Sequence, residues 1–112
     1  MNPDKKVMAL STSMMVLSLI ENGDKYGYEI IKILEERSND VFELKEGTLY
    51  PILHKLQSQG YVKSYEQEND NGKTRKYYTI TDKGRKLLSE KKTEWKIFTS
   101  AVNNVIGAEN YA

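Results

Sequence analysis

The sequence predicts a mainly α-helical protein that contains one small β-hairpin and ends in a long helix. In three segments apolar residues recur at intervals of three and four, the spacing of amphipathic helices, and a fourth segment is apolar on almost every side. Two stretches rich in tyrosine, valine, isoleucine and threonine flank the sequence NDNG, a pattern typical of a hairpin. The last apolar series continues for about 25 residues, or about 37 Å of helix, which is longer than a small core covers.

The composition indicates one intracellular globular domain. The 112 residues are 38% hydrophobic and 29% charged, which is typical of a folded chain and not of a disordered one. The absence of cysteine excludes disulfides and thiolate metal sites. The N-terminal region lacks a secretory pattern, and its apolar stretch is too short to span a bilayer, so we expect a cytoplasmic protein.

The charge is unevenly distributed although the net charge is only +1. Residues 72–86 contain six basic residues and one acidic residue, whereas residues 35–46 contain five acidic residues and two basic ones. One face is therefore expected to attract phosphate groups while another repels them.

The first helix is expected to run from about Lys6 to Glu21 and to end at Asn22-Gly23. Because it is apolar nearly all round, it needs two partners, for instance its own core and another subunit. We therefore place Met8 and Met15 at a dimer interface.

The second helix is expected to begin after an Asp24 cap and to run from about Lys25 to Ser38. Gly27 begins its apolar stripe and costs helix stability, which favours a close contact with another helix at that point. The rest of the stripe is Ile30, Ile31 and Leu34.

The third helix lies in the sequence GTLYPILHKLQSQG, from Gly47 to Gly60. Its apolar stripe is Leu49, Ile52, Leu53 and Leu56; the opposite side carries Gly47, Pro51, His54 and Ser58, flanked by Tyr50 and Lys55. Since proline is tolerated in the first turn of a helix, we expect the helix to start between Lys45 and Thr48, with Thr48 as a candidate cap.

The hairpin is expected to pair YVKSYEQE with KTRKYYTIT through a two-residue turn at Asn71-Gly72. The residues expected to face the core are Val62, Tyr78 and Ile80. The last helix is expected to begin at Thr81-Asp82 and to end at Gly107. Its seam, which resembles that of a coiled coil, is formed by Leu88, Lys91, Trp95, Phe98, Val102 and Val105.

Three helices, a hairpin and a long helix form the layout of a winged helix-turn-helix with a C-terminal dimerisation helix. The third helix would then place its slim polar face, with His54 and Lys55, in the DNA major groove. Residues of the hairpin tip would contact the backbone or minor groove: Lys73, Thr74, Arg75 and Lys76. Alternatively, these cations pair across the strands with Glu66, Glu68 and Asp70.

The segments KYGYEI, EGTLYPILHKLQSQGYV and GKTRKYYTITDKG resemble the signature segments of the PadR family of bacterial transcriptional regulators, in the same order. The single C-terminal helix is similar to that of the compact branch of the family, especially its multidrug-sensing members. The resemblance implies a homodimer that binds a pseudo-palindromic operator in double-stranded DNA, usually represses, and is released by a small molecule. It also implies DNA-facing positions at Tyr26, Thr48, Tyr50, Pro51, Lys73, Arg75 and Lys76.

Trp95 has two interpretations. It fills the dimer seam together with Phe98, Val102 and Val105, or, as in similar multidrug-binding regulators, it stacks on flat aromatic drugs. In the second case Met14, Met15 and Leu17 would line the same cavity. Lys91 and Lys92, one turn earlier, favour an anionic ligand or none.

We find no catalytic residues. A single histidine without cysteine or clustered acids forms neither a metal site nor a triad, and no glycine-rich phosphate loop is present, so no enzyme activity and no cofactor are expected. We expect residues 1–82 to form the DNA-binding domain and residues 83–112 the dimerisation helix. The alternatives are a protein-interaction module and, less favoured, an RNA-binding winged helix.

Overall fold

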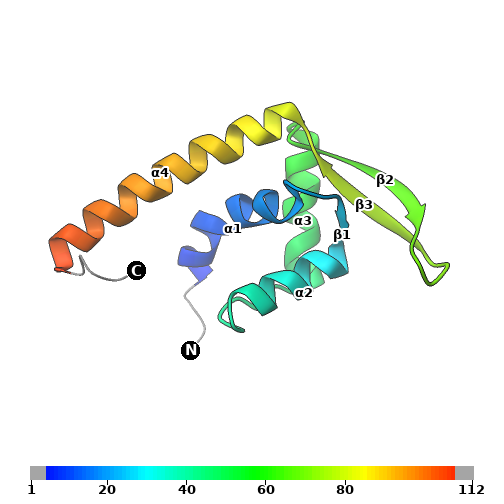
Figure 1. Ribbon diagram of the computed structural model, residues 1–112, viewed down its shortest axis with the longest axis horizontal. Helices are drawn as coiled ribbons and strands as arrows, with labels where there is room; N and C mark the ends of the chain where they lie inside the picture. The colour runs from blue at the N-terminus through cyan, green and yellow to red at the C-terminus, as the bar shows by residue number, and fades with distance from the viewer. Residues whose placement is uncertain (1–4, 108–112) are drawn as a thin grey trace.

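A computed structural model describes residues 5–107 of the chain, with side chains from residue 11 onward. Its elements are α1 (Lys5–Ile20), β1 (Lys25–Tyr26), α2 (Gly27–Arg37), α3 (Glu46–Ser58), β2 (Val62–Glu68), β3 (Thr74–Ile80) and α4 (Asp82–Ile106). The β2–β3 hairpin projects from one side of the three shorter helices and α4 extends from the other (Figure 1), so the molecule is elongated, 52 × 31 × 22 Å. The mainly helical fold with a small sheet is confirmed.

One hydrophobic core joins the helices to the inner face of the hairpin. Its fully buried side chains include Leu17, Ile30, Leu49, Leu53, Leu88 and Val62. The predicted stripes of α2 and α3 lie in this core, and so do the predicted hairpin residues Val62, Tyr78 and Ile80. The core thus fixes which face of α3 remains outside.

Gly27 allows α2 and α3 to approach closely. A Cβ atom at Gly27 would lie 2.6 Å from the hydroxyl oxygen of Tyr50, so any side chain there would displace the tyrosine. The close helix contact expected at this glycine is confirmed.

The predicted start of α2 is wrong by two residues. Lys25 and Tyr26 pair with Tyr78 and Tyr77 of β3, which makes a three-stranded antiparallel sheet in the order β1-β3-β2. Tyr26 takes the N-cap position instead of Asp24, and its backbone N–H donates to the Glu29 carboxylate at 3.1 Å. Pairing with β3 therefore satisfies backbone groups that a helix would have used.

Helix α3 starts within the range that the sequence predicts, but Thr48, the candidate cap, is not its N-cap. Lys45 occupies the N-cap and Thr48 is the third helical residue, with no side-chain capping bond. Pro51 consequently lies in the second turn and not in the first. The hydrogen bond that it removes would have ended on the carbonyl of Gly47, a residue that is exposed.

The hairpin turn is longer than predicted. The Asn69 N–H donates to the Lys73 carbonyl at 2.8 Å, which leaves three residues, 70–72, in the loop. Gly72 adopts the left-handed conformation, with φ of 76°. The Asn69 side-chain oxygen accepts bonds from the backbone N–H groups of Asn71 and Lys73, at 3.0 Å each, so it organises the loop.

Helix α4 has the predicted limits. The Thr81 hydroxyl accepts a bond from the Gly84 N–H at 3.0 Å, and Gly107 ends the helix in the left-handed conformation. Its N-terminal part enters the core through Leu88, whereas its second half leaves the body (Figure 1). Within residues 5–107, no helix has the length and apolar character that membrane crossing requires.

Candidate DNA-binding surface

The outer face of α3 is polar and open. Leu49, Leu53 and Leu56 anchor the helix in the core. The five residues expected to face DNA on this helix are all exposed: Thr48, Tyr50, Pro51, His54 and Lys55. The helix therefore presents hydrogen-bonding groups and one cation at a surface that is not charged throughout.

Tyr50 also makes a contact within the protein. Its ring packs over Gly27 at the start of α2, and it remains 42% exposed. The hydroxyl group is thus held beside the α2 N-terminus by packing, which restricts how it can present itself to a partner.

The wing, residues 62–80, carries exposed cations near its tip. Lys73, Thr74 and Lys76 are exposed. Glu66 lies opposite Lys76 in the hairpin register, yet among side chains of residues 11–107 the single ion pair within 4 Å joins Lys92 to Glu21. The alternative of cross-strand ion pairs is therefore not supported, and the wing lysines stay available to other anions.

Arg75 differs from its neighbours because it is half-buried. Its guanidinium carbon lies 5.5 Å from the centre of the Tyr26 ring, which is within cation–π range. Its Nε atom is buried and has no hydrogen-bond partner in the part of the chain that the structure describes. Tyr26 and Arg75, two residues expected at DNA, therefore contact each other at the junction of wing and α2.

The sequence did not reveal an aromatic row on the outer face of the sheet. Tyr26 and Tyr65 both lie opposite Tyr77 in the register. Burial raises the pKa of Tyr77, with the charge of Glu29 as the next cause. Alternation along the strands places Tyr65 and Tyr77 on one face once the register is known, but no local signal identifies the short strand that contributes Tyr26.

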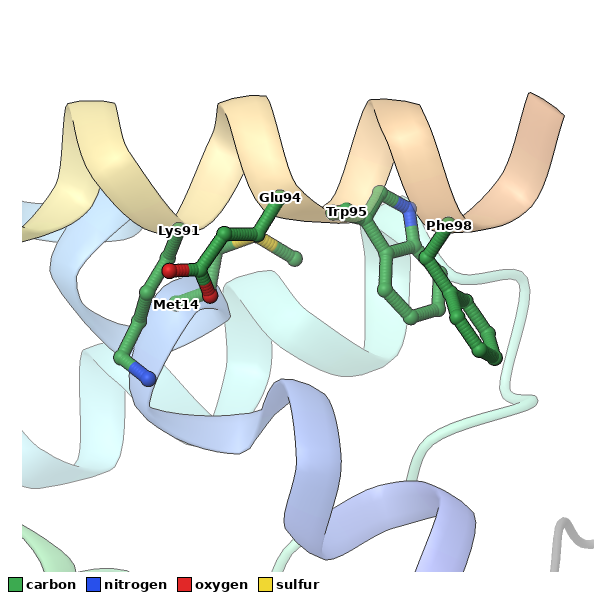
Figure 2. Close-up of a pocket in the computed structure, with 5 residues that line it drawn as sticks. All are labelled: Met14, Lys91, Glu94, Trp95 and Phe98. Atoms are coloured by element: carbon green, nitrogen blue, oxygen red, sulfur yellow. The ribbon is translucent and has the colours of Figure 1, made fainter. Parts of the chain in front are cut away.

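A second feature lies under α4. Met14 of α1 and four α4 residues, Lys91, Glu94, Trp95 and Phe98, line an open hollow of about 270 Å³ (Figure 2). The rings of Trp95 and Phe98 extend from the same side of α4, with centroids 6.1 Å apart, and Trp95 is 39% exposed. Met14 and Trp95 thus line one hollow, as the sequence analysis expected for a cavity, and Glu94, which it did not single out, lines the hollow too.

Other residues predicted for this region lie elsewhere. Leu17 is fully buried in the core and is not among the residues that line the hollow. Met15 is half-buried against the same core. The side chain of Met8 lies outside the described residues.

Farther along α4, Phe98, Val102 and Val105 are exposed, Val105 by 86%. Part of the predicted seam is therefore apolar surface that faces outward from the single chain. Within residues 11–107, no group of three or more histidine or carboxylate side chains is placed to hold a metal ion.

A slim polar helix seated on a core, followed by a cationic hairpin, defines a winged-helix protein of the DNA-binding class. Residues 16–90 match the transcriptional regulator PadR-like family, which is more than half of the chain. The chain belongs to this family, whose members are transcription regulators and not enzymes.

Related proteins agree with this assignment. The "uncharacterized protein X" of Lysinibacillus sphaericus is 40% identical over 81 residues, which is 72% of this chain and 74% of that protein. The negative transcriptional regulator PadR of Bacillus subtilis is 28% identical over 67% of this chain but only 41% of its own length. The crystal structure of a PadR-like transcriptional regulator from Bacillus cereus superposes with a TM-score of 0.81 at 30% identity, covering 90% of this chain and 96% of that one.

Proposed function

We propose that the protein is a cytoplasmic, sequence-specific repressor that binds a pseudo-palindromic operator as a homodimer and is released by a small aromatic effector. The observation that carries the DNA-binding part is the exposed polar face of α3 beside a wing whose lysines have no ion-pair partner among the side chains of residues 11–107. Base-edge contacts by α3 would supply specificity, and phosphate contacts by the wing would supply affinity and register. Repression is also what the name of the Bacillus subtilis relative states of that protein.

The DNA-binding part is tested with Lys73→Ala and Lys76→Ala. Binding of a labelled duplex from the region upstream of the gene is measured over a range of KCl concentrations. Each replacement should weaken binding to all sequences and flatten the dependence of log K on log salt by about one unit. Wild-type slopes in both variants would remove the wing from the proposal, and a wild-type protein that prefers no duplex would favour the protein-interaction alternative.

The homodimer is proposed from the apolar side of α4. Residues 83–112 would pair with a second copy and residues 1–82 would bind DNA, with the first turns of α4, up to Leu88, shared with the core. Dimerisation is typical of the family. Two α3 helices related by a two-fold axis would read half-sites about 10 base pairs apart.

Sedimentation velocity tests this pairing. Val102→Glu places a charge in the seam and should shift the protein toward monomer. Ser100→Glu places the same charge about 200° around the helix and should leave the dimer intact. A wild-type monomer, or equal effects of the two variants, would contradict the arrangement.

The effector is proposed from the hollow under α4. A flat ring could stack on Trp95 and Phe98 while Lys91 and Glu94 select its polar groups. Because Trp95 is the single tryptophan of the chain, its fluorescence reports on this site directly. Quenching by members of a panel of drugs and phenolic acids, together with release of the duplex, is the expected result; no response across the panel would leave Trp95 as a seam residue.

A further inference from the structure

A row of three tyrosines crosses the outer face of the sheet. Tyr26, Tyr77 and Tyr65 stand directly opposite one another on β1, β3 and β2, and side chains at opposed positions point to the same face. The Tyr26 and Tyr77 rings meet edge to face, with centroids 5.4 Å apart, and the Tyr77 and Tyr65 rings stack at 5.7 Å. The row links the edge strand of the wing to the residues that start α2.

A hydrogen bond closes this row. The Tyr65 hydroxyl donates to the Asp24 carboxylate at 2.6 Å, across 41 positions of sequence. A hydroxyl bonded to an ionised carboxylate makes one of the stronger hydrogen bonds found in proteins. This bond, more than any other cause, raises the pKa of Tyr65. Asp24 lies in the connection between α1 and β1, so the bond joins the wing to the helical body.

The position of this bond, at the base of the wing, allows it to influence where the wing tip lies. Strand β1 ends opposite Tyr77, and beyond that residue the wing is a two-stranded ribbon (Figure 1), which by itself is marginally stable. Lys73 lies four residues beyond Tyr77, or about 13 Å at about 3.3 Å per residue. A rotation of the hairpin by about 10° at its base would move Lys73 by about 2 Å, enough to break a contact that requires about 2.7–2.9 Å.

We propose that Tyr65 and Asp24 are positioning residues that set the angle of the wing relative to α3, so that Lys73 and Lys76 reach the DNA backbone while α3 lies in the groove. Arg75 supports them, because its guanidinium group packs on Tyr26 at the same junction. The inference rests on the proposed DNA-binding function. It differs from that function in assigning part of the affinity to two residues that need not touch DNA.

The experiment compares Tyr65→Phe, Asp24→Ala and Asp24→Asn with the wild type. Both Asp24 variants remove the same charge, but only asparagine keeps an oxygen that can accept the Tyr65 hydroxyl. Tyr61→Phe, which removes a hydroxyl just before β2, is the matched control. A labelled duplex of the gene's upstream region is titrated over a range of KCl concentrations, and thermal unfolding is followed by circular dichroism.

Tyr65→Phe and Asp24→Ala should weaken binding about fivefold to tenfold at moderate salt. They should also flatten the salt slope by about one unit for each phosphate group that the wing no longer reaches, although neither removes a cation. Asp24→Asn should bind more tightly than Asp24→Ala and keep most of the wild-type slope. Tyr61→Phe should behave as the wild type. Melting temperatures should change by only a few degrees, since the bond lies at the surface.

Wild-type slopes in both Tyr65→Phe and Asp24→Ala would overturn the inference, and so would identical binding by the two Asp24 variants. If the loss of affinity across the variants parallels their loss of melting temperature while the salt slope is unchanged, the two residues have a purely structural role. That result would also overturn the inference. If the wild-type protein binds no duplex selectively, the DNA-binding proposal fails first. If the wild type binds selectively and both Tyr65→Phe and Asp24→Ala bind as the wild type does, only the positioning role is removed.

Discussion

Replacing Gly47 with alanine should make the protein more stable and a poorer DNA binder. Gly47 is the second residue of α3, and beyond its own stretch of helix a Cβ atom there would meet no atom of the described residues within 4 Å. Its φ angle is not in the left-handed region, so alanine fits the backbone. Alanine exceeds glycine in helix stability by about 0.5–1 kcal/mol, which should raise the melting temperature by about 2–6 °C.

The same methyl group should interfere with DNA. Gly47 lies on the open side of α3, opposite the leucines that anchor the helix, and no contact in the described part of the chain requires a glycine there. If this end of α3 lies against the bases or the backbone, the methyl group should weaken binding at least about tenfold, or about 1.4 kcal/mol.

Fluorescence anisotropy with the upstream duplex measures the affinity of this variant, and circular dichroism measures its unfolding. Ser100→Ala, on the exposed side of α4 away from its seam, is the control that should gain helix stability without loss of DNA affinity. A Gly47→Ala protein that is stabilised and binds DNA as the wild type does would refute the close approach of α3.

Three further predictions follow from the packing. Gly84→Ala should destabilise the fold by about 3 kcal/mol or more, because its Cβ would collide with the backbone carbonyl of Tyr61. The melting temperature should fall by more than about 10 °C. A melting temperature near that of the wild type would show that α4 can shift away from Tyr61. Glu21→Gln breaks the surface ion pair with Lys92 and should change the free energy of unfolding, measured by urea titration, by less than about 1 kcal/mol. A larger loss of unfolding free energy would mean that the ion pair anchors α4. The pKa of Tyr65 is raised above its ordinary value of 10.0, first by its hydrogen bond to Asp24, so folding favours the neutral hydroxyl. The stability that this bond contributes should be complete below pH 10 and lost as the pH rises above it. Tyr65→Phe should therefore make the alkaline fall in melting temperature shallower, and parallel profiles of melting temperature against pH would contradict this.

The elements with a one-sided apolar stripe could be predicted from the sequence because the stripe defines both the helix and its orientation. In α3 the spacing of Leu49, Leu53 and Leu56 determined which face is buried, and the opposite face followed. The caps of α4 were equally local, since Thr81 bonds to Gly84 three residues later and Gly107 alone adopts the left-handed turn that ends the helix.

Helix α1 shows why some side chains could not be assigned. It is apolar nearly all round, so the sequence predicts a helix without indicating its rotation about its axis. Met14 and Leu17 were equivalent candidates for the hollow, and only the folded chain separates them, because it buries Leu17 in the core and leaves Met14 at the hollow. The short strand β1 is a similar case, because Lys25 and Tyr26 become a strand only by pairing with β3, some 50 residues later.

The two projecting parts of the fold carry side chains that contribute little to the stability of a single chain. The exposed apolar residues of α4 and the wing lysines lie outside the core, which is completed at Leu88. Substitutions such as Val102→Glu and Lys73→Ala should therefore change association while leaving the unfolding of one chain nearly unaltered. Because binding adds RT ln(1 + [L]/Kd) to stability, DNA binding and dimerisation should each raise the melting temperature of the wild type. Val102→Glu should lose only the increase in melting temperature that comes from dimerisation, and Lys73→Ala only the increase that comes from DNA.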